Sequence, residues 1–256
     1  MSNTPAAPLS AQRAVPRTSL WRTFMPPIVV LVMAVVVGAW VATAELDSIE
    51  KRTLNFDYIS ARVREHLFLS VSASILVALL AIPLGILIHR SSSKTLRSVA
   101  LGVANIGQAT PAVGLVILLA IVWKTGFSTA LIAIVAYAFL PVLRNTLTGL
   151  AEVDSAVRES ALGMGMTPSQ VLRRIELPLA SPVILAGLRT SLVFAVGVAT
   201  IATFINAGGL GDMIVNGLKL QRYPVLLVGA GLVAAIAILI DWLAGLVEDR
   251  VRPRGL

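Results

Sequence analysis

The sequence predicts an all-α integral membrane protein with about six transmembrane helices. Of the 256 residues, 57% are hydrophobic and 13% are charged, whereas soluble domains carry about 25% charged residues. The mean hydropathy is +0.87, and a soluble chain of this composition would lack the polar surface that it needs in water. The apolar residues gather into runs that suit a bilayer, which a helix crosses with about 20 apolar residues.

Polar segments separate the apolar runs. We expect the spans at residues 25–44, 67–88, 99–123, 127–143, 182–205 and 225–247. The chain then divides into an N-terminal tail at 1–24, a first span with an external segment at 25–66, a main membrane domain at 67–247 and a C-terminal tail at 248–256. Residues 42–44 also fit a signal-peptidase site. The apolar run before them is longer than that of a typical signal peptide, so we expect the first span to be retained.

The connection between the fourth and fifth spans predicts folded structure rather than a loose loop. Asp154 is placed to cap a first helix, and apolar residues follow at helical spacing on one side of it. The residues on this side are Val157, Ala161 and Met164. Gly163 and Gly165 then allow the chain to leave the helix, because glycine tolerates positive φ.

A second short helix is predicted after Thr167. Pro168 suits the first helical position, and Gln170 completes a capping box with Thr167. The apolar stripe is Val171, Leu172 and Ile175, and the polar side is Ser169, Gln170, Arg173 and Arg174. We expect Leu177-Pro178 to end this helix, because proline disfavours helix in the residue before it. A new helix would then start at Ser181-Pro182 and enter the membrane.

Positive charge predicts the side of the membrane on which this connection lies. Six spans place both termini on one side. If the termini and residues 144–189 are inside, the inner segments carry 14 Lys and Arg residues and the outer segments carry 7. Such an excess marks cytoplasmic segments, so we expect the connection and both termini in the cytoplasm. The net charge of +8 reflects the same bias, and we expect no nucleic-acid partner.

Several function classes lack the residues that they need. The chain has no cysteine, and its two histidines, His66 and His89, lie far apart at span ends, so we expect no metal site and no catalytic triad. A P-loop for ATP phosphates is also missing from the sequence. A secondary transporter would carry ion-binding residues deep in its spans or two similar halves, and a membrane enzyme would carry a cluster of His, Asp or Glu. The sequence favours neither, and we expect a non-catalytic subunit.

The connection resembles the EAA loop of ABC-importer permeases. The matching residues are Glu159, Ala161, Gly165, Ile175, Leu177 and Pro178, spaced as E-A-A, three residues, G, nine residues and I-x-L-P, with Ser160 in place of the middle alanine. The resemblance implies a type I ABC-importer transmembrane domain at 67–247 with an EAA loop at 159–178. In this family the loop is cytoplasmic and carries a coupling helix that docks in a groove of the ATPase subunit.

Further segments resemble the permeases of osmoprotectant importers for glycine betaine, carnitine and choline. They are HLFLSVSASILVALLAIPLGILIHR, IGQATPAVGLVILLAIVW and ATFINAGGLGD, together with the EAA loop. The resemblance runs from Leu67 to about Asp241 and implies uptake of a quaternary amine across the bacterial inner membrane. A permease for another small solute, such as an amino acid, is the alternative, and a secondary transporter is a more remote one.

The resemblance also implies partners and site residues. ATP and Mg²⁺ would bind to a separate ATPase dimer, so we expect no cofactor in this chain. A second permease, identical or related, would complete the pathway within the lipid bilayer, and an extracytoplasmic binding protein would deliver the substrate. The residues expected to couple to the ATPase are Glu159, Ala161, Gly165, Thr167, Ser169, Gln170, Arg173 and Arg174, with Ile175, Leu177 and Pro178 shaping the loop.

Polar residues interrupt the third predicted span. Polar groups at membrane depth are tolerated where they face a cavity or packed protein. One interpretation is that Asn105, Gln108, Thr110 and Pro111 line the translocation path. The other is that Thr110-Pro111 caps a shorter span and leaves residues 105–108 at the membrane interface.

The last connection, residues 206–224, faces outside and contains the motif AGGLGD. Candidates for contact with the binding protein are Gly208, Gly209, Gly211 and Asp212, and the alternative is an ordinary glycine-rich turn. The chain is only 5% aromatic, so we expect an aromatic cage for a quaternary amine to belong to the binding protein. Asp241, near the inner end of the last span, is expected to lie at the interface rather than to act as a counter-ion or proton carrier.

Overall fold

The computed structural model describes residues 20–91 and 93–251, and within these residues every regular element is a helix. The elements are α1 Leu20–Thr43, α2 Ser48–Thr53, α3 Phe56–Ser91, α4 Lys94–Ala109, α5 Ala112–Val122, α6 Phe127–Ala151, α7 Ser155–Gly163, α8 Pro168–Val171, a π-helical turn Leu172–Glu176, α9 Leu177–Ala199, a 3₁₀ turn Ile201–Ile205, α10 Gly211–Lys219 and α11 Tyr223–Val251. The all-α prediction is confirmed.

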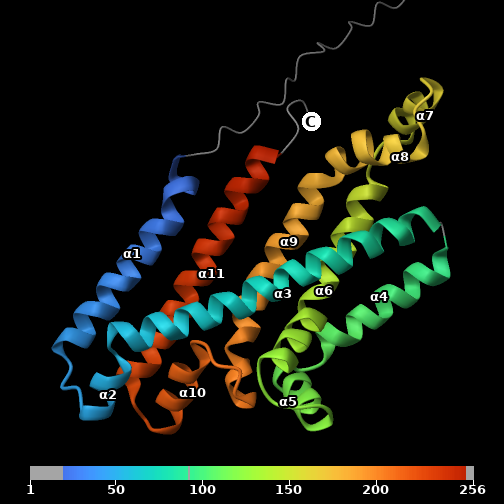
Figure 1. Cartoon of the computed structure of the whole chain (residues 1–256). Helices are drawn as coiled ribbons and strands as arrows, with labels where there is room; N and C mark the ends of the chain where they lie inside the picture. The colour runs from blue at the N-terminus through green and yellow to red at the C-terminus, as the bar shows by residue number, and fades with distance from the viewer. Residues whose placement is uncertain (1–19, 92, 252–256) are drawn as a thin grey trace, which may run out of the picture.

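Five helical segments among the described residues are long and apolar enough to cross a membrane. They are α1, α3, α6, the continuous segment Pro168–Ala199 that contains α9, and α11. The pair α4 and α5 passes the same test only as one unit and then supplies a sixth span. Figure 1 shows the long helices as one bundle that α3 crosses obliquely. The prediction of about six spans is confirmed in this form.

The predicted third span is not one straight helix. The axes of α4 and α5 are bent by 97° at a break of two residues. Pro111 explains the break, because it lacks an N–H and disfavours helix in the residue before it. Thr110 is accordingly extended, with ψ of 132°, and its hydroxyl donates to the carbonyl of Ile106 at 2.7 Å. The third predicted span therefore consists of two helices, and the break falls within the polar stretch that interrupts it in the sequence.

The core of the bundle consists of α3, α6 and α9. Small residues bring these helices close together. A Cβ on Gly85 would lie 2.7 Å from Cγ2 of Thr146, and a Cβ on Gly187 would lie 2.6 Å from Cβ of Asn145. Buried apolar clusters fill the space between these three helices. The same clusters extend to α4 and α5. Close approach through small residues is the usual packing of membrane helices, where lipid is as apolar as the side chains.

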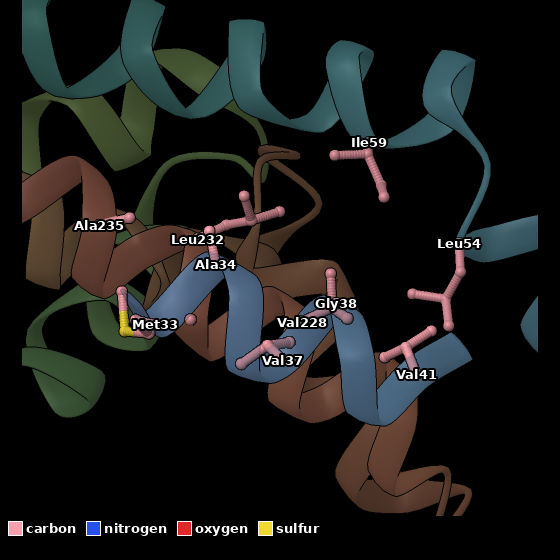
Figure 2. A pocket seen from close by; sticks show the side chains of 11 residues that line it. Met33, Ala34, Val37, Gly38, Val41, Leu54, Ile59, Val228, Leu232 and Ala235 are labelled. Atoms are coloured by element: carbon pink, nitrogen blue, oxygen red, sulfur yellow. The ribbon is translucent and has the colours of Figure 1, made fainter. Parts of the chain in front are cut away.

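The first helix lies at the edge of the bundle and packs along α11 (Figure 1). Its apolar window is not buried within the chain, which suits a helix that faces lipid on most sides. An apolar cavity of about 230 Å³ opens between α1, α11 and the start of α3. Figure 2 shows its lining, which comes mainly from α1 and α11, with Leu54 and Ile59 at one side. The first predicted span thus exists as a helix beside the main domain.

The bundle has two ends with different elements. Figure 1 shows the described ends of α1 and α11 at the same end as α7 and α8, which we call the elbow end. The opposite end carries α2, α5 and α10, and we call it the crown end. Leu20 and Val251 therefore lie on the same side, as an even number of crossings requires. The tails at 1–19 and 252–256 lie outside the described residues.

Several helices extend beyond the predicted spans that they contain. The helix of the second span, α3, starts at Phe56, where Asn55 accepts a hydrogen bond from the N–H of Tyr58 at 2.8 Å. The early turns of α3 lie at the crown end and carry charged side chains, among them Arg62 and Glu65. The connection at 206–224 is more than a turn, since it contains α10. The last helix, α11, continues past the predicted span end at residue 247 to Val251.

Candidate functional site

Residues 154–176, which we call the elbow, project from one end of the bundle (Figure 1). Both predicted helix starts in the elbow are confirmed. The carboxylate of Asp154 accepts a hydrogen bond from the N–H of Ala156 at 2.8 Å. The hydroxyl of Thr167 accepts from the N–H of Gln170 at 3.3 Å, and the side-chain oxygen of Gln170 accepts from the N–H of Thr167 at 2.8 Å. Local hydrogen bonds therefore set the beginning of each short helix.

The turn between α7 and α8 depends on one glycine. Gly165 has φ of +87°, whereas Gly163 does not have a positive φ. The N–H of Gly165 donates to the carbonyl of Leu162 at 2.9 Å. The N–H of Met166 donates to the carbonyl of Ala161 at 3.2 Å, which completes a Schellman motif. The prediction that glycine ends α7 is confirmed for Gly165, while Gly163 is an ordinary helical residue.

The predicted helix end at Leu177-Pro178 is wrong. The N–H of Leu177 donates to the carbonyl of Leu172, five residues back, so the chain widens into a π-helical turn. The wider turn accommodates Pro178, which has no N–H to continue the regular pattern. One turn later, the hydroxyl of Ser181 donates to the carbonyl of Pro178 at 2.9 Å and replaces the N–H that Pro182 lacks. The chain from α8 to α9 is thus one helical segment.

The underside of the elbow packs on the membrane helices. Val171 and Leu172 are buried and Ile175 is half-buried, so the predicted apolar stripe is confirmed. Leu172 belongs to a buried cluster with Leu150 of α6 and Ile184 of α9. Burial of this stripe holds the elbow against the ends of two core helices, since burying one leucine side chain contributes roughly 1.5–3 kcal/mol.

A buried carboxylate also holds the elbow. Glu176, at the end of the π-helical turn, is 7% exposed, and its Oε1 lies 3.9 Å from Nη1 of Arg158 in α7. A cavity of about 230 Å³ lies beside this pair and is lined by His89 and Arg90 from the end of α3. This pair was not predicted from the sequence. An acidic residue beside the apolar stripe of the second helix was the available signal.

The outer surface of the elbow is partly polar, as predicted. The exposed residues of the predicted coupling set are Glu159, Gly165, Thr167, Ser169, Gln170, Arg173 and Arg174. Ala161 is the exception, because it is 1% exposed and packs inside the elbow.

The tip of the elbow is apolar. Met164 is 76% exposed, and Val157 and Leu162 are each 43% exposed. Val157 and Met164 belong to the predicted apolar side of α7, but unlike Ala161 they are not covered by the rest of the chain. Neighbouring exposed apolar side chains on a projecting turn are typical of a protein-binding surface.

The predicted pathway residues lie at the end of α4. Asn105 is exposed, and its Oδ1 accepts a hydrogen bond from Nη2 of Arg144 in α6 at 3.4 Å. Gln108 is half-buried on the same helix, one turn further on. Thr110 and Pro111 end α4, as the second interpretation expects. The exposure of Asn105 is also compatible with the first interpretation, in which these residues line the translocation path. Their role in the pathway stays a prediction.

The glycines of the AGGLGD motif lie mostly inside the chain. Gly208 is half-buried, whereas Gly209 and Gly211 are buried. A Cβ on Gly209 would lie 3.2 Å from Nδ1 of His66, and a Cβ on Gly211 would overlap the carbonyl of Thr200. His66 lies inside α3 and is fully buried, rather than at a span end. The two buried glycines therefore permit close packing. A contact of this motif with a binding protein stays a prediction.

Asp212 is held by side chains of the same chain. Its Oδ2 lies 2.7 Å from Nη1 of Arg62, and its Oδ1 accepts a hydrogen bond from the hydroxyl of Thr203. Nη1 of Arg62 is also 2.9 Å from Oε2 of Glu65, and that same oxygen accepts the N–H of Gly209 at 2.9 Å. This network ties the motif to the start of α3.

Asp241 forms an ion pair within the membrane-spanning region. Its two carboxylate oxygens accept hydrogen bonds of 2.5 Å from Nε and Nη2 of Arg189, in a two-point contact between α11 and α9. Glu248 adds a second carboxylate 3.7 Å from Nη1 of Arg189. Asp241 is therefore a counter-ion for Arg189, while its position at the membrane interface stays a prediction. Across residues 20–91 and 93–251, no group of three His, Asp or Glu side chains is placed to hold a metal ion.

A family model described as the binding-protein-dependent transport system inner membrane component matches residues 81–253 of the chain. The chain belongs to this family. The matched region includes the whole elbow and the core helices α6 and α9. The protein is therefore a permease component of a transport system rather than a free-standing pump, and the resemblance seen in the sequence is confirmed.

Curated relatives of this permease are permeases of osmoprotectant systems. It is 43% identical over 200 residues to the carnitine transport permease protein OpuCD of Listeria monocytogenes, covering 78% of this chain and 89% of the relative. It is 40% identical over 192 residues to the choline transport system permease protein OpuBB of Bacillus subtilis (strain 168), covering 75% and 88%. It is 35% identical over 216 residues to the osmoprotectant import permease protein OsmW of Salmonella typhimurium, covering 82% and 100%.

Solved structures share the fold of this permease. An inward-facing MetNI methionine ABC transporter matches with a TM-score of 0.66 and 22% identity, covering 76% of this chain and 96% of the other. An amino acid ABC transporter with histidines matches with a TM-score of 0.65 and 20% identity, covering 81% and 100%. The type I ABC-importer transmembrane fold is thereby confirmed.

Proposed function

We propose that this permease moves a small quaternary-amine osmoprotectant across the bacterial inner membrane, driven by a separate ATPase that docks on the elbow. The observation that carries the proposal is the exposed apolar tip of α7, around Met164. The turn after this tip leads into α8, and α8 continues without a break into the membrane helix α9. The printed names of the relatives, which include carnitine, choline and osmoprotectant transport, support this class of substrate.

The continuous segment from α8 to α9 supplies the coupling. An ATPase that moves α8 displaces α9 directly, because the π-helical turn keeps the chain helical between them. The buried stripe and the Arg158–Glu176 pair keep the elbow in one arrangement against α3 and α6. ATP and Mg²⁺ belong to the ATPase dimer in this mechanism, and the permease itself contributes movement rather than catalysis.

A second permease, identical or related, completes the pathway in this proposal. Large apolar side chains remain exposed on α4 and α5, among them Val103, Ile106 and Ile121. Lipid or a second permease covers such a surface within a membrane. The elbow end with both termini then faces the cytoplasm, and the crown end faces an extracytoplasmic binding protein.

Purification of the transporter from its own cells tests the docking surface. We expect Met164→Asp and Glu159→Lys each to lower the amount of ATPase that copurifies with the tagged permease by at least about tenfold. Each variant introduces a new charge into the surface on which the ATPase is proposed to dock. Leu218→Asp is the matched control, since Leu218 is 65% exposed on α10 at the crown end. Recovery of the ATPase at wild-type levels with both elbow variants would contradict the proposal, as would ATP-independent uptake by the wild-type permease alone.

A further inference from the structure

An open face runs along α4, α6 and α9 within the membrane-spanning part of the chain. Its exposed and half-buried members include Asn105 and Gln108 of α4, Tyr137 and Arg144 of α6, and Thr190 and Phe194 of α9. Tyr137 and Arg144 are seven residues apart and so share one side of α6, and Thr190 and Phe194 share one side of α9. Two contacts link members of this set across helices: Asn105 with Arg144, and Tyr137 with Phe194.

Arg144 directly follows the predicted fourth span at 127–143, but α6 continues past it, and the whole helix Phe127–Ala151 is apolar enough to cross a membrane. Arg144 lies seven residues before the end of α6, and Oδ1 of Asn105 accepts its hydrogen bond at 3.4 Å. No carboxylate within residues 20–91 and 93–251 forms an ion pair with Arg144, whereas Arg189 is paired with Asp241. Ionisable residues inside spans are costly and mark substrate or ion pathways. The guanidinium therefore lacks an anionic partner that a ligand can supply.

An aromatic pair lies further along the same face. The rings of Tyr137 and Phe194 meet edge to face, with centroids 6.1 Å apart and planes inclined by 70°. The pair joins α6 to α9, and Phe194 remains 36% exposed. Faces of aromatic rings attract ammonium groups, and quaternary ammonium ligands are commonly held this way. Aromatic side chains are only 5% of this chain, so their pairing beside Arg144 is not a result of aromatic abundance.

The cationic and aromatic groups lie close enough for one small ligand. The backbones of Tyr137 and Arg144 are separated by about 10 Å along the helix. Side chains tilt toward the start of a helix, so the guanidinium of Arg144 and the ring of Tyr137 are displaced in the same direction and keep this separation. The bond from Arg144 to Asn105 agrees with the tilt, because a Cβ on nearby Gly107 would lie 2.8 Å from the carbonyl of Ala136. The guanidinium and the ring pair are thus about two helical turns apart, a gap that one small zwitterion can bridge between its two charged ends.

We propose that this face is a transit site for a zwitterion, with Arg144 and Asn105 holding a carboxylate while Tyr137 and Phe194 face a quaternary ammonium. The proposal rests on the proposed function and sharpens its substrate class. Glycine betaine and carnitine carry both groups, whereas choline has a hydroxyl in place of the carboxylate and meets an uncompensated positive charge. Capture from outside belongs to the binding protein, so the transit site controls the maximal rate of uptake rather than KM.

Uptake by the cells that produce the permease, with the partner genes intact, tests the site. Radiolabelled glycine betaine, carnitine and choline are the probes. We expect Arg144→Gln to lower the maximal rate of uptake of both zwitterions about tenfold and to leave KM unchanged. A tenfold change is what the loss of one charge-assisted contact would produce. We expect no loss for choline, a smaller loss with Arg144→Lys, and a loss for all three with Tyr137→Leu. Arg97→Gln, in the exposed first turn of α4, is the matched control, and immunoblots measure membrane levels.

The outcomes separate the transit site from the function on which it rests. A wild type that imports only the two zwitterions supports the transit site, provided that Arg144→Lys retains more uptake than Arg144→Gln. Wild-type rates in Arg144→Gln, or equal losses for the zwitterions and choline, overturn the transit site and leave the proposed function intact. Import of choline alone by the wild type also overturns it. Absence of ATP-driven uptake of all three probes overturns the proposed function itself.

Discussion

The elbow and the AGGLGD motif are both glycine-containing turns that the sequence offered as partner contacts, yet they are built differently. In the elbow, a Cβ on Gly165 would meet no atom within 4 Å, so the glycine serves its positive φ alone. In the motif, Gly209 and Gly211 are crowded by His66 and the carbonyl of Thr200. The acidic side chains of the two turns differ as well. Glu159 in the elbow is exposed, whereas Asp212 in the motif forms an ion pair with Arg62.

The difference teaches how to interpret a glycine-rich motif in a membrane protein. A glycine that serves conformation leaves its surroundings open, and the turn can present neighbouring side chains such as Met164 to a partner. A glycine that serves close packing brings two backbones together, and the turn anchors the fold. The elbow is of the first kind and the AGGLGD motif is of the second.

The largest expected effect comes from filling a crowded glycine. Gly211→Ala forces its methyl group into the carbonyl of Thr200, and we expect destabilisation at the upper end of the roughly 1–3 kcal/mol that overpacking costs. Gly197→Ala is the matched control on α9, because a Cβ there meets no atom within 4 Å. Thermal melting of the purified permease measures both variants. Equal melting temperatures would show that the motif is not a packed anchor.

A smaller effect is expected when the charge network of the motif is broken. Arg62→Met leaves Asp212 without its cation, and we expect a loss of about 1.5–3 kcal/mol, as for hydrogen bonds to charged groups. Asp212→Asn should cost less in the Arg62→Met background than alone, with a coupling of about 0.5–3 kcal/mol. Arg64→Met is the control, since Arg64 is exposed two residues along the same helix. Strictly additive losses would exclude a direct role for the pair.

The smallest effect on stability is expected in the elbow. Gly165→Ala forces a left-handed conformation on alanine, which costs about 1–2 kcal/mol and acts on the turn alone. Gly163→Ala, two residues earlier, is expected to be neutral or slightly stabilising, because Gly163 is helical and open. Hydrogen exchange of the elbow amides measures the local change. Faster exchange in both variants alike would contradict the assignment of the turn to Gly165.

Local features of the elbow could be predicted because they depend on neighbours in the chain. The caps at Asp154 and Thr167 and the Schellman turn at Gly165 each join atoms within five residues. The prediction of a helix end at Leu177-Pro178 failed because one local rule was outweighed by other local contacts. Pro178 disfavours helix in its neighbour, but a π-helical turn and the hydroxyl of Ser181 let the chain continue as a helix.

The sequence by itself determined the membrane class, the helix starts of the elbow and the family spacing, because composition and short-range hydrogen bonds do not depend on how helices meet. The tertiary structure decided which groups pair and which remain open. Arg62 lies 150 residues from Asp212, and Arg189 lies 52 residues from Asp241. Only the rotation and depth of each packed helix bring such groups together, and the same packing leaves Arg144 and Met164 uncovered for partners outside the chain.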